Sequence, residues 1–275
     1  MPKVAAIQMT SLASVDANLA TARSLLERAH AQGVRLAALP ENFAIMGRKE
    51  ADKLAVAEAF GEGPIQAFLS RCARELEMWL VAGTIPIRAE DGSGKVAAAC
   101  LVFDDQGRFV TRYDKIHLFD VDLPDREERY RESATIVPGS KPVVVRTPLG
   151  HLGLSVCYDV RFPELFRILQ TMGAEILCLP AAFTAATGRA HWETLVRARA
   201  IENLCYVIAP AQSGMHENKR ETWGESMIVD PWGHVLARVG EEGAGLAVAE
   251  IDLTLLNQVR ERFPSLTHRR FHISL

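Results

Sequence analysis

Short apolar runs alternate along the chain with segments whose apolar residues recur every three or four positions, and this alternation predicts strands separated by helices. Strand-like runs in the first half lie at residues 4–9, 34–39, 80–87, 97–103 and 109–113. Between the first two runs apolar side chains recur at helical spacing, and Gly33 follows them as a stop signal. Pro64 opens a second amphipathic helix that continues to Leu76.

The second half of the chain repeats this order. Strand-like runs lie at residues 143–146, 152–156, 176–179, 206–209, 226–229, 235–239 and 246–251. Helical spacing recurs near residues 163–172 and 191–203, and the sequence DPWG at 230–233 predicts a hairpin turn. Strands that alternate with helices and are interrupted by hairpins predict an α/β protein with mixed sheets covered by helices. Both of these later helices are apolar over much of their circumference, so we expect one face to be a subunit contact.

Length and composition predict one domain over residues 1–275. Hydrophobic residues make up 48% of the 275 positions, and no stretch rich in Pro, Gly or Ser offers a linker. A net charge of -3 with scattered basic residues gives no footprint for nucleic acid or an anionic membrane. The N-terminus lacks the apolar core of a signal peptide, and the longest apolar runs are too short to span a bilayer. We therefore expect a soluble, cytoplasmic protein.

The cysteine pattern separates one residue from the other four. The five cysteines, an odd number, are widely spaced without a Cys-x-x-Cys pair, so neither a disulfide framework nor a metal cage is expected. Cys157 alone ends an apolar run directly before a helix that Pro163 opens. A turn of this kind exposes a sulfur at a strand end while backbone N–H groups point at the same place. The alternative is an ordinary buried thiol, because free cysteine is often a small core residue.

Three charged residues follow other predicted strands or turns. Glu41 lies just past the run at 34–39, Lys115 lies just past the run at 109–113, and Glu132 precedes a Pro-Gly turn. Strand ends gather at one edge of such sheets, so we expect these groups to meet Cys157. Each position taken alone is also typical of a solvated surface residue.

Together these residues form a chemically complete set for hydrolysing a carbonyl–nitrogen bond. Glu41 can take the proton of the Cys157 thiol during attack and return it to the departing nitrogen. Lys115 and the backbone N–H of Tyr158 can stabilise the oxyanion of the tetrahedral intermediate. Glu132 can orient Lys115 or the substrate nitrogen.

These residues resemble the nitrilase superfamily of carbon–nitrogen hydrolases, over essentially the whole chain. The matching motifs are LPEN at 39–42, YDKIHLFD at 113–120, VCYDVRFPEL at 156–165 and GRAHWE at 188–193. The resemblance implies that Glu41 is the general base, Lys115 the oxyanion-stabilising lysine and Cys157 the nucleophile. Glu132 matches the second glutamate of the family, with Glu128 as the alternative because residues 125–131 look about one residue longer than in close relatives.

The resemblance also implies the fold and the substrate class. The family fold is an α-β-β-α sandwich of two mixed sheets flanked by helices, which pairs into homodimers or larger homo-oligomers and needs no cofactor or metal. Tyr158-Asp159 follows the cysteine where true nitrilases have Trp-Glu, which favours an amidase branch. The chain most resembles the branch that hydrolyses deaminated glutathione to 2-oxoglutarate and cysteinylglycine. The alternative is an ω-amidase that hydrolyses 2-oxoglutaramate, or another small-amide hydrolase of the family.

Several residues are candidates for binding such an anionic amide. Arg161 is the first candidate for a substrate carboxylate, against a structural role in a pair with Glu164 or Asp159. Thr187 and His191 lie where relatives line the pocket, although a histidine at a helix start is more often a cap or a packing residue. Lys219 and Arg220 are expected to be solvated loop residues unless their loop closes over the site.

Two readings from other classes remain open. A non-catalytic binding or scaffold protein could retain this fold, but all three residues of the implied triad are present. A zinc amidohydrolase would use His117, His151 or His191 with Cys157, but their spacings match no metal motif.

Overall fold

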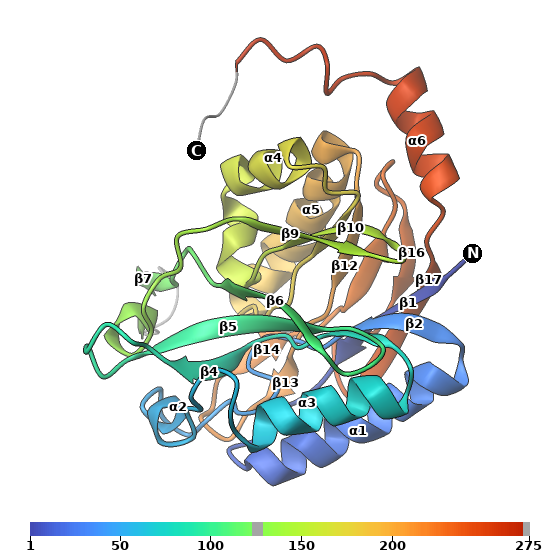
Figure 1. The fold of residues 1–275 in the computed structure, drawn as a ribbon. Coiled ribbons are helices and arrows are strands. Elements are labelled where there is room, and N and C mark those ends of the chain that lie inside the picture. The colour runs from blue at the N-terminus through green and yellow to red at the C-terminus, as the bar shows by residue number, and fades with distance from the viewer. Residues whose placement is uncertain (123–128, 272–275) are drawn as a thin grey trace.

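Two mixed sheets pack face to face with helices on both outer sides, as Figure 1 shows. This computed structural model describes residues 1–122 and 129–271. The first sheet has the order β17 (Gly245–Glu250), β1 (Lys3–Gln8), β2 (Val34–Ala38), β3 (Trp79–Val81), β5 (Val96–Phe103) and β4 (Ile85–Arg88), and β6 (Phe109–Asp114) also pairs with β5. Because β1, β2 and β3 run parallel and β17 runs antiparallel to β1, the sheet is mixed, as predicted.

The second sheet is also mixed. Its order is β16 (Val235–Arg238), β15 (Met227–Val229), β12 (Tyr206–Ala209), β11 (Ile176–Cys178), β10 (Gly150–Leu154) and β9 (Val143–Thr147). Helices α1 (Val15–Ala31) and α3 (Pro64–Glu75) cover the first sheet, and α4 (Pro163–Thr171) and α5 (Ala185–Asn203) cover the second (Figure 1). The α-β-β-α sandwich is therefore confirmed.

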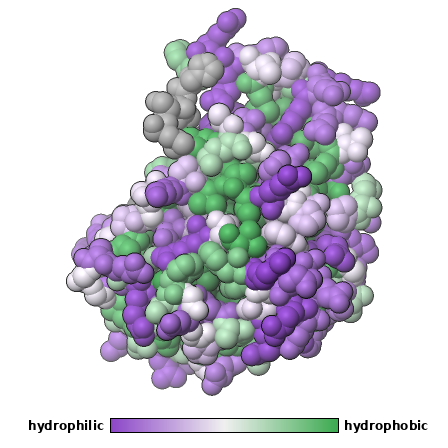
Figure 2. Space-filling view, in the orientation of Figure 1, coloured by the Kyte–Doolittle hydropathy of each residue, from purple (hydrophilic) through white to green (hydrophobic). Residues whose placement is uncertain are grey.

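Side chains that alternate between the two faces of each strand divide the core into two layers. In β1, Val4 and Ala6 pack with the second sheet, whereas Ala5 and Ile7 pack with α1 and α3. This follows from the two-residue period of a strand, which sends successive side chains to opposite faces. On the outer face that Figure 2 displays, apolar side chains gather in the middle, over the region of β9, and hydrophilic side chains surround them.

The ends of α1 follow the sequence signals. The Ser14 hydroxyl caps the start by accepting from the Ala17 N–H, and Gly33 follows the helix with a φ of 77°. Helix α6 (Leu253–Arg262) follows β17 near the C-terminus. None of the helices in the described part of the chain is long and apolar enough to cross a membrane.

The predicted strand over residues 80–87 is wrong as a single element. The structure divides it into β3 and β4 at Gly83, whose φ is 56°. A Cβ at Gly83 would lie 2.0 Å from the Pro40 carbonyl oxygen, so only glycine permits this close approach. The break also lets the Thr84 hydroxyl accept the Asn42 N–H at 2.9 Å, which fixes the backbone directly after Glu41.

Candidate active site

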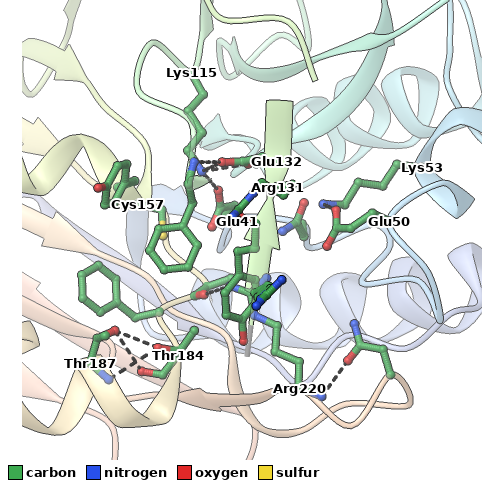
Figure 3. Close-up of a pocket in the computed structure, with 18 of the residues that line it drawn as sticks. Glu41, Glu50, Lys53, Lys115, Arg131, Glu132, Cys157, Thr184, Thr187 and Arg220 are labelled. Atoms are coloured by element: carbon green, nitrogen blue, oxygen red, sulfur yellow. Dashed lines mark hydrogen bonds and ion pairs between the residues drawn. The ribbon is translucent and has the colours of Figure 1, made fainter. Parts of the chain in front are cut away.

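Cys157 lies on a strained turn between β10 and the short helix η2 (Cys157–Arg161). Its φ is 46°, which is rare for a residue other than glycine. The Cys157 N–H donates to the Pro180 carbonyl at 2.8 Å, so the turn is fastened to the chain that leaves β11. The side chain is buried and lies beside Glu41 (Figure 3). Tyr158 is the second residue of η2, where backbone N–H groups have no acceptor within the helix.

Lys115 follows β6 and is buried between two carboxylates. Its Nζ donates to Glu41 Oε1 at 2.8 Å and to both oxygens of Glu132 at 2.9 and 2.8 Å (Figure 3). The side chain is only 2% exposed, so an unpaired ammonium here would be very costly. Burial alone lowers the pKa of Lys115, but the charges of Glu132 and Glu41 raise it well above its usual value. Lys115 is therefore a permanent cation.

Glu41 stands between the ammonium and the thiol. It lies just past β2 and is 3% exposed. Burial raises the pKa of its carboxyl, but the charge and hydrogen bond of Lys115, with a smaller contribution from Arg220, lower the pKa below its usual value. The side chain is therefore ionised and can accept a proton.

The Cys157 thiol is protonated at rest. Burial raises its pKa far above that of an ordinary cysteine, and the negative charge of Glu41 raises it further. Lys115 and the Ala182 N–H lower the pKa, but by less. A protonated thiol that hydrogen-bonds to an ionised carboxylate suits general-base catalysis, in which the proton leaves as the sulfur attacks.

Glu132 holds Lys115 from the side opposite Glu41. It begins the short helix η1 (Glu132–Ala134), and its Oε2 also accepts the Phe119 N–H at 2.6 Å. With both oxygens on Lys115, Glu132 fixes the ammonium rather than facing open solvent. The alternative position, Glu128, lies outside the described residues.

Asp159 joins the cysteine turn to the lysine segment, a role that sequence reasoning missed. This fully buried carboxylate accepts from the Tyr113 hydroxyl at 2.6 Å and from the Val156 N–H at 2.7 Å. It also accepts the His117 N–H at 3.1 Å and lies 2.7 Å from His117 Nδ1. Tyr113 and His117 flank Lys115, so Asp159 sets where the ammonium lies relative to the sulfur. The available signal was an acidic residue two positions after the cysteine, which the sequence interpretation considered as a mark of the amidase branch and as a partner of Arg161.

The three charged groups and the thiol open into a cavity of about 450 Å³. Tyr158, Arg161 and Thr187 also line it, and the Thr187 hydroxyl lies 2.8 Å from that of Thr184 at the start of α5. Arg161 does not pair with Glu164 or Asp159. Its guanidinium lies over the rings of Tyr158 and Phe183, at 5.9 and 5.2 Å from their centroids.

The histidines have separate partners. His191 is exposed and lies outside the residues that line the cavity, where its Nδ1 contacts the Arg161 guanidinium at 3.4 Å. His117 contacts Asp159, and His151 Nδ1 lies 3.1 Å from Glu175. The histidines of the zinc alternative therefore do not converge on Cys157. In the described ranges, no group of three or more His, Cys, Asp or Glu side chains is placed to hold a metal ion.

Arg220 corrects the expectation of a solvated loop residue. It precedes β14 (Glu221–Trp223), lines the cavity, and donates from Nη2 to the Ala182 carbonyl at 2.5 Å. Lys53 in α2 (Asp52–Ala55) and Glu50 also line it and pair at 2.9 Å (Figure 3). Lys53 and Glu50 do not lie at a strand end or in a recognisable motif, so no feature of the sequence indicates that they line the cavity.

The family model, the relatives and the solved structures that match this chain all indicate one family. The family model for carbon–nitrogen hydrolases matches residues 3–261. A deaminated glutathione amidase from Synechocystis sp. (strain PCC 6803 / GT-S) is 48% identical, with 97% of each chain covered. The deaminated glutathione amidase from Homo sapiens is 43% identical, covering 98% of this chain and 83% of the relative. The crystal structure of the C. elegans NitFhit protein superposes with a TM-score of 0.91 at 40% identity; the match covers 98% of this chain but 65% of that longer one.

We predict that Asp159→Asn lowers kcat/KM for amide hydrolysis by about 10-fold or more. Whichever way the amide is turned, its NH₂ would face a backbone N–H donor, that of Val156 or that of His117, and the buried mismatch costs about 1–3 kcal/mol. Asp104→Asn is the matched control. Asp104 is also a buried carboxylate that accepts backbone N–H groups, from Gln106 and Arg108, but it lies outside the cavity lining. Both variants should lower the melting temperature, and only Asp159→Asn should lower kcat/KM. Wild-type kcat/KM in folded Asp159→Asn would contradict the role given to Asp159.

Proposed function

This chain belongs to the carbon–nitrogen hydrolase family, and from that premise we propose deaminated glutathione as its substrate. It is an amidase, a hydrolase of carbon–nitrogen bonds other than peptide bonds. The proposed reaction cleaves the amide between the 2-oxo acid and the dipeptide, giving 2-oxoglutarate and cysteinylglycine. The observation that carries the chemistry is the buried Lys115 ammonium bonded to Glu41 beside the Cys157 thiol. The substrate is supported by the names of relatives that match this chain along almost its whole length.

In the proposed mechanism, Glu41 accepts a proton and then donates it in each half of the reaction. The Cys157 sulfur attacks the amide carbonyl while Glu41 takes the thiol proton, and the oxyanion is stabilised by Lys115 and the Tyr158 N–H. The carbon–nitrogen bond then breaks as Glu41 passes the proton to the nitrogen, leaving a thioester on the sulfur. Glu41 next takes a proton from water, the hydroxide oxygen attacks the thioester, and the proton returns to the sulfur as the carbon–sulfur bond breaks.

The remaining residues of the site hold the Lys115 ammonium in place or bind the substrate. Glu132 holds the ammonium in place, because both of its oxygens contact Lys115. We assign Arg161 to the carboxylate of the 2-oxo acid, since its guanidinium lies on aromatic rings at the cavity wall and has no carboxylate partner in the described ranges. Thr187 lines the same cavity, and His191 supports Arg161 from outside it.

Purified protein tests both the substrate and the nucleophile. We expect a higher kcat/KM for deaminated glutathione than for 2-oxoglutaramate, which shares the acyl half but releases ammonia. Cys157→Ala should lower hydrolysis by about 10³-fold or more, because the nucleophile is lost. Cys178→Ala, which changes a buried thiol in β11, is the control and should stay active. Negligible turnover of deaminated glutathione with rapid ammonia release would favour the ω-amidase, and unchanged hydrolysis by Cys157→Ala would refute the nucleophile.

We also propose that residues 1–275 form one cytoplasmic domain. The family model spans residues 3–261, and β1 near the N-terminus pairs with β17 near the C-terminus. All five cysteines are unpaired, as in proteins of reducing compartments. A single calorimetric transition is expected. Two separable transitions would refute the single domain, and recovery in a membrane or secreted fraction would refute the location.

We propose that the chain forms a homodimer through an apolar patch near the end of α5. The patch consists of Ile201, Trp232 and Phe263, which are 46, 53 and 50% exposed. Gly233 lies against Ile201, and the Trp232 and Phe263 rings are 5.5 Å apart, so the three side chains form one surface. Covering such a surface stabilises association.

Sedimentation velocity should therefore give the mass of two or more chains. Trp232→Glu should shift the protein toward monomer, whereas Leu54→Glu, which changes an exposed leucine in α2, should leave the assembly intact. A wild-type monomer at all concentrations would contradict the dimer. Equal assembly of the Trp232→Glu and Leu54→Glu variants would show that the interface does not include this patch.

A further inference from the structure

The basic side chains that line the cavity differ in whether a carboxylate neutralises them. Lys115 contacts Glu41 and Glu132, and Lys53 contacts Glu50. Arg48 pairs with Glu217, and Arg129 and Arg131 pair with Asp122. Within the described part of the chain, Arg161 and Arg220 are the lining arginines without a carboxylate in ion-pair distance.

Arg220 is held in place by uncharged groups. One hydrogen bond from Nη2 reaches the Ala182 carbonyl, and the guanidinium lies 5.1 Å from the centroid of the Tyr130 ring. Its Nε is buried and finds no hydrogen-bond partner among the described residues. A guanidinium fixed by a ring and a carbonyl keeps most of its donors and its full charge for a planar anion.

Arg220 lies close to the Cys157 turn and to the carboxylates of Glu41 and Glu50. Ala182 connects the two groups, because its carbonyl accepts from Arg220 while its N–H donates to the Cys157 sulfur. After Lys115, the charge of Arg220 is the next group that lowers the pKa of Glu41, and it also acts on Glu50. Figure 3 shows Glu41 between Cys157 and the pair of Glu50 and Lys53. Since Glu41 delivers the proton to the departing nitrogen, we expect the leaving group to extend from Glu41 toward Glu50 and Lys53. Arg220 lies near this region, because its charge acts on both Glu41 and Glu50.

We propose that Arg220 binds the terminal carboxylate of the leaving dipeptide and thereby selects a peptide-like leaving group over ammonia. This assignment rests on the proposed function. Two residues in extended conformation span at most about 7 Å, so the leaving nitrogen and its terminal carboxylate are separated by a distance that a cavity of about 450 Å³ accommodates. Arg161 then holds the carboxylate at the acyl end, and the scissile amide lies between the two arginines.

The test compares three substrates. They are deaminated glutathione, its analogue with the glycine carboxylate converted to a carboxamide, and 2-oxoglutaramate, which has no carboxylate in the leaving group. In Arg220→Met, kcat/KM for deaminated glutathione should fall about 10- to 100-fold, mainly through KM, because a charged hydrogen-bonded pair is lost. The carboxamide analogue and 2-oxoglutaramate should lose far less. Arg220→Lys should recover part of the lost kcat/KM, since it restores charge without the planar fork.

Arg71→Met is the matched control, because it makes the same substitution at an exposed arginine of α3 that lies outside the cavity lining. It should leave all three kcat/KM values near those of the wild type. An equal loss of kcat/KM on all three substrates in Arg220→Met would overturn the assignment, and would indicate that Arg220 acts on Glu41 or on the acyl carboxylate. Unchanged kcat/KM on all three substrates would also overturn it. If the wild-type enzyme fails on deaminated glutathione itself, the proposed function has failed, a result visible before any variant is compared.

Discussion

The site depends on one buried ammonium held between two carboxylates. Lys115 is almost without solvent contact, and Glu41 and Glu132 supply the charge that makes its burial tolerable. The three residues come from the end of β2, the end of β6 and the start of η1. Their mutual attraction therefore fixes three distant segments of the chain, and the oxyanion-stabilising charge is in position before any substrate arrives.

The same arrangement decides the protonation of the nucleophile. In sites where cysteine lies beside a cationic group alone, the thiolate forms in advance. Here the Glu41 carboxylate raises the pKa of the Cys157 thiol by more than Lys115 lowers it, so the thiol keeps its proton until attack begins. Asp159 maintains this geometry from the other side, because it ties the cysteine turn to the residues that flank Lys115.

Sequence patterns predicted mixed sheets covered by helices and charged residues just past strand ends, because side-chain period and element order determine both; the α-β-β-α layering was implied by the family resemblance. The interruption at Gly83 was missed, since its cause is the close approach of Pro40 from a distant segment. Asp159 and Arg220 were assigned to the surface or to the wrong partner for the same reason. Their roles come from hydrogen bonds to residues 38 to 46 positions away, which local patterns do not encode.

The most direct test of this account is the ultraviolet absorbance of the thiolate, measured across pH as the difference between the wild-type protein and Cys157→Ser. The account predicts that no Cys157 thiolate appears as the pH passes the ordinary cysteine value of about 8.5, because burial and Glu41 hold the proton on sulfur. A thiolate signal that is already complete near neutral pH would contradict it, and would replace general-base attack with a preformed ion pair of Cys157 and Lys115.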